Sequence, residues 1–248
     1  MKGSDGPDVI RKAFELGAQP IAPARAREAL QTLALHRPTF ELVTYPHEMG
    51  ADEAMASGFE PTVLGSIVSG ATTAMDTQRA ARDMANYGVE LLLFVGGDGT
   101  ARDIYEAVGE TLPVLGIPAG VKIHSSVYVI NPRRVGDVVQ AFLQGRTPVC
   151  ERDVMDIDED LFRLGRVSAR LYGYLRVPFE ERLVQSAKSP NTSPATSVAA
   201  LATYVAEIVD SDDCYYILGP GTTLRAIGQS LGIDKTLLGV DVVYRREL

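Results

Sequence analysis

Hydrophobic and polar positions follow two recurring patterns along the first 145 residues. Short apolar runs predict four strands, at residues 39–44, 63–68, 90–95 and 114–117. Longer amphipathic stretches predict helices at residues 23–35 and 77–87, and another that ends near residue 108. The continuous apolar run over residues 90–95 suits a strand that is buried on both faces. Strands that alternate with helices in this way predict a doubly wound α/β layer.

Local signals mark where two of these helices begin or end. Pro23 stands where a proline of the first helical turn is expected. Thr73 and Asp76 have the spacing of a capping box, and Gly88 follows the last position of the same helix. The helix over residues 77–87 is therefore expected to open just after Thr73 and to end at Gly88.

The pattern changes after residue 145. Alternating polar and apolar residues predict strands at 151–158 and 167–177. A helix at 196–209, a strand at 214–218, a turn and a helix at 222–231 are expected to follow. We therefore predict an N-terminal α/β domain at residues 1–146 and a C-terminal domain at 147–248. The second domain is expected to be β-rich to about residue 185 and α/β after that.

The strongest chemical signal lies between the predicted strand 90–95 and its following helix. The segment reads Gly96, Gly97, Asp98, Gly99 and Thr100. Glycines permit positive φ and let backbone amides approach a ligand closely. The start of the following helix offers free N–H groups to a phosphate. The segment therefore predicts a phosphate-binding loop, although it lacks the Lys-Ser/Thr ending of a P-loop.

An acidic residue in such a loop needs its own explanation. Asp98 either binds a metal ion that bridges phosphates, or takes a proton from an attacking hydroxyl. The alternative is a plain turn between strand and helix, with Asp98 as the helix cap.

Two further segments are candidate phosphate contacts. Lys122, His124 and Ser125 follow the strand predicted at 114–117, and ligands of open α/β sheets gather beyond the strand C-termini. A surface lysine beside a structural histidine is the alternative there. A second turn between strand and helix contains four candidates, namely Gly219, Gly221, Thr222 and Thr223. A helix cap without a ligand is the alternative for that turn.

Composition narrows the classes of partner. The net charge is −8, which argues against a nucleic-acid-binding surface. Two cysteines are too few for a disulfide scaffold, and no apolar run approaches the roughly 20 residues of a membrane span. We therefore expect a cytoplasmic protein that contacts neither nucleic acid nor membrane.

The glycine-rich segments resemble a known family. Residues 94–104, with the string Gly-Gly-Asp-Gly-Thr, and residues 116–125 resemble the ATP-NAD kinase-like branch of the NAD kinase and diacylglycerol kinase superfamily. Residues 154–158 and 218–223 are similar to the same branch, whose members are described as polyphosphate- or ATP-dependent NAD kinases. The resemblance implies a Rossmann-like N-terminal α/β domain, followed by a β-rich C-terminal domain with an α/β segment.

The resemblance also implies an activity. In NAD kinases the aspartate of this motif is the proposed base on the 2′-hydroxyl of the adenosine ribose of NAD. Carried over, Asp98 is the base, and the phosphate loop consists of Gly96, Gly97, Gly99 and Thr100. The expected donor is Mg-ATP or polyphosphate, with Mg²⁺ as cofactor, and the expected product is NADP. A homo-oligomer is also expected from the resemblance.

The chain departs from the family pattern in two ways. NAD kinases carry an Asn-Glu or Asn-Asp pair that grips the dinucleotide, and this sequence contains no such pair. The first residues resemble the piece that follows the first strand and loop of these kinases, and residue 248 is an early end for this branch, so we expect a fragment or a truncated member. The expected acceptor is NAD or a related nucleotide. Because the pair is missing, two other functions stay open: a kinase of a lipid or small metabolite, and a nucleotide-binding sensor without turnover.

Overall fold

The computed structural model divides the chain into two compact units, each of which is described by itself. The first contains residues 1–156 and 169–187, and the second contains residues 157–168 and 188–248. The structure describes residues 12, 14–35, 40–120, 123–157, 169–180, 183–184, 201–202, 205, 208–209, 214–236 and 239–244. The side chains of residues 156, 157 and 169 are outside this description.

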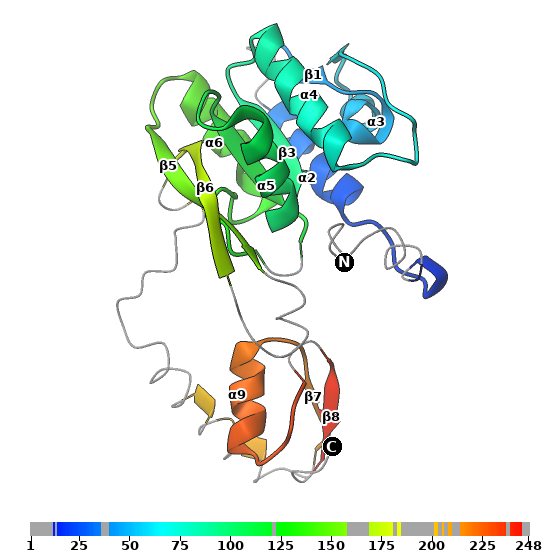
Figure 1. Ribbon diagram of the computed structural model, residues 1–248, viewed down its shortest axis with the longest axis vertical. Coiled ribbons are helices and arrows are strands. Elements are labelled where there is room, and N and C mark those ends of the chain that lie inside the picture. The colour runs from blue at the N-terminus through cyan, green and yellow to red at the C-terminus, as the bar shows by residue number, and fades with distance from the viewer. Residues whose placement is uncertain are drawn as a thin grey trace. The chain divides into compact units, whose positions relative to one another are not determined.

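The first unit alternates helices and strands (Figure 1). Its first elements are α2 (Ala22–Ala34), β1 (Val43–Thr44), the 3-10 turn η2 (His47–Met49), α3 (Ala51–Ala56), β2 (Thr62–Val63) and α4 (Ala74–Tyr87). The chain continues with β3 (Leu92–Gly96), α5 (Asp98–Val108), β4 (Val114–Pro118), η3 (Pro132–Arg134), α6 (Val135–Leu143), β5 (Val149–Ile157) and β6 (Ala169–Pro178). This order confirms the predicted α/β class.

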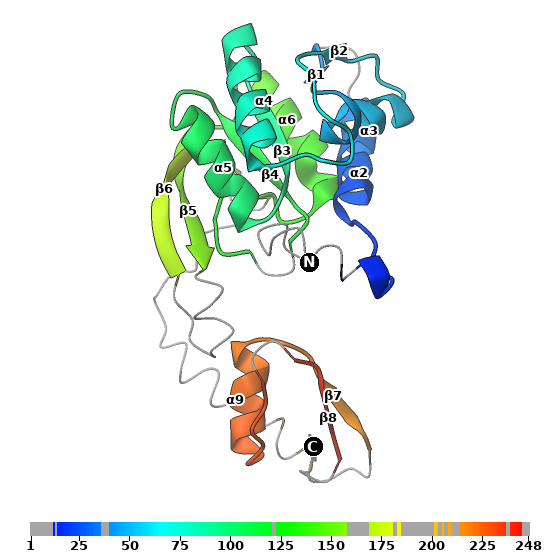
Figure 2. The same cartoon turned by 45° about the vertical axis from the view of Figure 1, so that its right-hand side comes forward.

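The parallel pair β3–β4 is the centre of this unit. Leu92 pairs with Val114, and the register runs to Gly96 beside Pro118. Both strands therefore end at the same edge, where the glycine-rich segment begins. Helix α4 packs on α5, and α2 packs on α6 (Figure 2).

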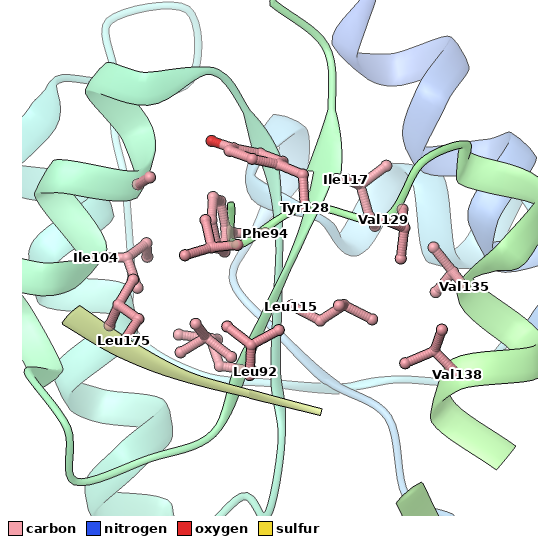
Figure 3. Packing of buried hydrophobic residues seen from close by; sticks show 14 of the residues in the cluster. Leu92, Phe94, Ile104, Leu115, Ile117, Tyr128, Val129, Val135, Val138 and Leu175 are labelled. Atoms are coloured by element: carbon pink, nitrogen blue, oxygen red, sulfur yellow. The ribbon is translucent and has the colours of Figure 1, made fainter. Parts of the chain in front are cut away.

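Alternate residues of β3 and β4 pack on opposite sides, as the period of a strand requires. Figure 3 shows these two groups of side chains. On the side of α5 and β6 lie Leu92, Phe94, Ile104, Tyr128 and Leu175. On the side of α6 lie Leu115, Ile117, Val129, Val135 and Val138. Burial on both sides explains why these strands read as continuous apolar runs.

Helix α4 follows its predicted boundaries closely. The Thr73 N–H donates to Asp76 Oδ2 at 2.8 Å, which is half of the predicted capping box. Gly88 ends the helix in the left-handed conformation, with φ of 97°. The capping residues therefore fix both ends of this helix.

Two predicted strands are wrong in length. Of residues 40–44, only Val43–Thr44 form a strand, and residue 39 is outside the description. The strand predicted at 63–68 is Thr62–Val63 instead. These two strands, β1 and β2, pair with each other in parallel, and their ladder is two residues long. Helix α3 was not predicted, because its six residues are too few for a clear helical period.

The second unit has a small core of its own. Strand β7 (Tyr216–Leu218) pairs antiparallel with β8 (Asp241–Val243), and α9 (Thr222–Ser230) lies between them in sequence. Buried residues of this core are Ala202, Val209, Leu218, Ile227, Leu231, Ile233 and Val243. The predicted strand 214–218 and helix 222–231 thus agree with the structure to within two residues at either end.

The predicted domain boundary at residue 146 falls inside the first unit. Strands β5 and β6 cluster with that unit and not with the C-terminal residues. A β-rich C-terminal domain, and the division at 146, therefore stay predictions. Among the described residues, no helix is both long and apolar enough to cross a membrane.

Candidate active site

The predicted phosphate loop lies at the edge of the sheet where β3 ends. We call residues 96–100 the glycine loop. Gly97 is the N-cap of α5, and Asp98 is the first residue of that helix. The Ala101 N–H bonds to Gly97 O at 3.1 Å, so the earlier N–H groups of α5 precede the first helical hydrogen bond. These N–H groups are available at the positive end of the helix dipole.

The glycines are needed for close packing and not for unusual backbone angles. Gly96, Gly97 and Gly99 are not among the described glycines with positive φ, so that expectation was wrong. A side chain at Gly96 would overlap Thr100 Oγ1. A Cβ on Gly120 would lie 3.2 Å from the Cα of Gly97. The missing side chains let the glycine loop touch both its own helix and the chain after β4.

The segment after β4 is held against the glycine loop. We call residues 119–126 the β4 loop; its residues 121 and 122 are outside the description, so the candidate Lys122 cannot be placed. The Ala119 N–H donates to Gly96 O at 2.9 Å. The close approach of Gly97 and Gly120 lies next to this bond. The structure thus brings two of the predicted segments together.

The Asp98 side chain also links these two loops. Its Oδ1 accepts from the N–H groups of His124 and Ser125 at 3.2 and 3.0 Å. Its Oδ2 accepts from the His124 N–H at 2.9 Å and lies 3.2 Å from His124 Nδ1. The Asp98 side chain has an exposed fraction of 0% and that of His124 has 18%. Asp98 is therefore covered by the β4 loop, and His124 reaches the surface.

The charge of Asp98 is stabilised by these donors. Burial by itself would raise the pKa of Asp98, because desolvation disfavours the carboxylate. The hydrogen bonds from His124 and Ser125 outweigh burial and hold the pKa of Asp98 below its ordinary value. The carboxylate is consequently ionised at neutral pH.

Ser125 ties the β4 loop to the next sheet. Its hydroxyl donates to Met155 O and accepts from the Met155 N–H, both at 2.9 Å. The neighbouring Ser126 N–H donates to Asp153 O at 3.0 Å. The Ser125 hydroxyl is therefore occupied by β5, and its predicted contact with a phosphate stays a prediction.

Tyr128 contacts the glycine loop from the segment that pairs with β4. It was not predicted as a site residue. Its hydroxyl donates to Gly97 O at 2.6 Å. The ring packs edge-on against Phe94, and a side chain at Gly116 would overlap it. The continuous apolar run at residues 127–130 was the available signal, because such a run is typical of a strand-like segment, and Tyr128 does pair with Gly116 of β4.

The second predicted turn lies in the other unit. Gly219 follows β7, Gly221 caps α9 with φ of 131°, and Thr222 and Thr223 are exposed in the first turn. The Arg225 N–H bonds to Gly221 O at 2.9 Å. The strand, turn and helix expected here are present, and the binding of an anion stays a prediction.

The described residues do not provide a protein-held metal site. No group of three or more His, Cys, Asp or Glu residues in this part of the chain is arranged for a metal ion. The four contacts of Asp98 also use the positions around both of its oxygens. A protein-held Mg²⁺ therefore does not fit the described residues.

Comparison with known proteins places the glycine loop in a family. Residues 10–147, more than half of the chain, match the family model described as the ATP-NAD kinase N-terminal domain. The chain belongs to the ATP-NAD kinase family. No curated protein and no solved structure matches it significantly. The ATP-NAD kinase domain contains the glycine loop and the β4 loop, whereas Gly219 and Thr223 lie beyond the match. The match confirms the resemblance to this family.

Proposed function

We propose that the protein transfers a phosphoryl group from ATP or polyphosphate to the 2′-hydroxyl of the adenosine ribose of NAD or a related nucleotide. Membership of the ATP-NAD kinase family supports a kinase. The observation that carries the proposal is the buried Asp98 carboxylate, which joins the glycine loop to the β4 loop. Such a link fits phosphoryl transfer, because that reaction depends mainly on positioning and on charge stabilisation.

The glycine loop is the proposed phosphate site. Gly96, Gly97, Gly99 and Thr100 surround the start of α5, where N–H groups and the helix dipole favour an anion. The glycines have no side chain that would keep a phosphate from the backbone. Asp98 is the buried first residue of α5, and its hydrogen bonds hold the glycine loop and the β4 loop together.

The remaining candidates have narrower roles in the proposal. His124 faces Asp98 from the β4 loop and is partly exposed. Gly219, Gly221, Thr222 and Thr223 are proposed as a separate phosphate contact of the second unit. Mg²⁺ is proposed to bind together with the donor, because Mg²⁺ is commonly held through substrate phosphates. We also propose, from the resemblance alone, that the protein is a homo-oligomer.

The test is an assay for NADP. The purified full chain is incubated with Mg²⁺, NAD, and either ATP or polyphosphate, and NADP is measured enzymatically. We expect NADP to form with at least one donor, and the Asp98→Asn variant to lose most of this turnover. Asp137→Asn is the matched control, because Asp137 is an exposed residue of α6 that pairs with Arg134. The control is expected to keep the wild-type rate.

Other outcomes would contradict the proposal in different ways. Phosphorylation of a lipid or of a small alcohol, without NADP, would replace NAD as the acceptor. Thermal stabilisation by ATP or NAD without turnover on any acceptor would indicate a nucleotide-binding sensor. Equal rates for the wild type and Asp98→Asn would remove Asp98 from the site.

A further inference from the structure

An arginine of α5 and an arginine of β6 meet at one aromatic ring. The guanidinium carbon of Arg102 lies 5.6 Å from the centroid of the Tyr172 ring, and that of Arg170 lies 5.5 Å from it. Both distances are within the range of a cation–π interaction. Because the two guanidiniums share this ring, their positive charges also repel each other at close range. We call Arg102 and Arg170 the arginine pair.

The contacts between α5 and β6 show how the strand runs relative to the helix. Strand β6 packs on α5 (Figure 1). Arg102 contacts Tyr172, whereas Tyr105, three positions later on the helix, lies against the next strand residue, Gly173. A side chain at Gly173 would overlap the Tyr105 ring. Residue numbers therefore increase in the same direction along α5 and along β6.

This common direction places Arg170 level with the glycine loop. Arg170 comes two residues before Tyr172, which corresponds to about 6.6 Å of strand. Asp98 comes four residues before Arg102, which corresponds to about 6 Å of helix. The exposed Arg170 at the start of β6 is therefore beside the start of α5, where N–H groups are available to an anion.

The arginine pair is a local positive site in a chain of net charge −8. The carboxylates of Asp103 and Glu106 lie 3.7 and 4.0 Å from the Arg102 guanidinium and offset part of its charge. Within the described part of the chain, no carboxylate pairs with Arg170. A bound anion would relieve the repulsion between the two guanidiniums. Phosphate suits them best, because a guanidinium can donate two parallel hydrogen bonds to its oxygens.

The start of α5, Arg170 beside it and Arg102 one turn further along the helix form a row of anion-binding groups. A row of this kind fits several linked phosphates better than a single one. ATP and polyphosphate carry a longer run of linked phosphates than the diphosphate of NAD. We propose that the arginine pair binds the linked phosphates of the donor, next to the terminal phosphate at the glycine loop. The inference rests on the proposed function.

Binding of inorganic tripolyphosphate to the full chain, measured by titration calorimetry, tests the pair without any turnover. We expect Arg170→Gln to weaken binding about tenfold or more, because charge-assisted hydrogen bonds to phosphate are lost. Arg102→Gln should also weaken binding, by a smaller factor, because Asp103 and Glu106 already offset part of that charge. Arg170→Lys keeps the charge but not the planar fork, so its affinity should lie between those of Arg170→Gln and the wild type.

Arg176→Gln is the matched control. Arg176 is an exposed arginine of the same strand, about 20 Å beyond Arg170 and away from the glycine loop. Its replacement changes the net charge by the same amount, and we expect the affinity for tripolyphosphate to stay at the wild-type value. Equal losses for Arg176→Gln and Arg170→Gln would overturn the site, because general attraction to the surface would then explain the binding. Wild-type affinity in both Arg102→Gln and Arg170→Gln would overturn it as well.

Parallel titrations with ATP and with tripolyphosphate distinguish the two sources of linked phosphates. Weaker binding of both ligands to Arg170→Gln supports contacts with the phosphates that they share. A loss confined to one ligand supports the pair and identifies that ligand as the donor. In the NADP assay, Arg170→Gln should raise the KM for the donor and leave the KM for NAD unchanged. A rise confined to the KM for NAD would overturn the inference, because the pair would then bind the acceptor.

The outcomes separate this inference from the proposed function. A wild type that forms NADP, with a donor KM that neither arginine variant changes, would overturn only the arginine pair. A wild type that binds tripolyphosphate through Arg170 and phosphorylates no acceptor would overturn the function, while the pair would stay an anion site. A wild type that binds neither tripolyphosphate nor ATP would overturn the pair, whatever the NADP assay shows.

Discussion

Tyr128 holds the glycine loop although it lies outside the motif. Its hydroxyl makes one neutral hydrogen bond to Gly97 O, and such a bond contributes about 1 kcal/mol. Tyr128→Phe removes the bond and keeps the ring over Phe94. We expect the melting temperature of the first unit to fall by about 2–4 °C, as measured by calorimetry.

The control for this variant is Tyr87→Phe. Tyr87 donates to Glu41 at 2.9 Å, and the bond is exposed. Its loss should change the melting temperature less, because water can replace it. Equal shifts for the two variants would mean that the bond from Tyr128 does not specifically stabilise the glycine loop.

Asp98 makes stability depend on pH with a defined sign. Despite its burial, hydrogen bonds lower the pKa of Asp98 in the folded protein, so its ionised form stabilises the fold. This contribution is fully present above the pKa of the unfolded chain, about 3.9, and is lost as pH falls through the lower folded value. The difference in unfolding free energy between wild type and Asp98→Asn should therefore be constant from about pH 7 to 5 and shrink below about pH 4. Urea denaturation at several pH values measures it, and a difference that stays constant in acid would contradict the assigned cause.

The sequence predicted the candidate residues better than their contacts. Glycines, an aspartate and a helix start are local signals, so the phosphate loop could be proposed from residues 96–100. The partners of Asp98 lie 26 and 27 positions later in the chain. Only the parallel pairing of β3 with β4 brings them together, and local pattern does not encode that register. The expectation of positive φ at these glycines was also wrong. The glycines are needed instead for close packing between the two loops, which a local pattern does not reveal.

At the scale of elements, Ser125 connects the β4 loop to β5. The hydroxyl pairs with both backbone groups of Met155, and Ser125 is buried. Ser125→Ala leaves that N–H and that carbonyl without their partner, which costs about 1–3 kcal/mol. Ser69→Ala is the control, because Ser69 bonds to Glu48 at an exposed position. Chemical denaturation should show the larger loss for Ser125→Ala, and equal losses would contradict the role of this link.

The predictability of an element followed its length and burial. Strand β4 is buried on both faces, and β3 is buried on one face and half-buried on the other, so their apolar runs stand out in the sequence. Helix α4 was predicted because its capping residues mark both ends. Strands β1 and β2 form only a two-residue ladder, although the predicted strands around them contain further apolar residues, of which Val68 is exposed. Strand β8 was missed, because three residues give no clear period.

At the scale of the whole molecule, two separate hydrophobic cores predict two cooperative transitions. The larger core surrounds β3 and β4, and the smaller one surrounds α9. Unfolding of proteins with more than one domain is often not two-state. Calorimetry of the full chain should therefore show that Tyr128→Phe shifts one transition and leaves the other in place.

Lys235 provides the complementary change in the second unit. Its side chain has no exposed surface, and its Nζ donates to Thr236 O, Gly239 O and Asp241 Oδ2, at 3.0, 3.0 and 2.6 Å. All three N–H donors of the ammonium are satisfied, so the group holds the chain before β8. Lys235→Met leaves the Asp241 carboxylate without its cation, and breaking a buried pair in this way costs about 3–5 kcal/mol. We expect only the transition of the second unit to shift downward.

The double variant Lys235→Met, Asp241→Asn tests the cause of that shift. It leaves no unpaired charge, so part of the lost stability should return, although the bonds to Thr236 O and Gly239 O remain absent. No recovery would mean that packing around Lys235, and not its charge, stabilises the second unit. A single transition that both Tyr128→Phe and Lys235→Met lower would show instead that the two cores unfold as one cooperative structure.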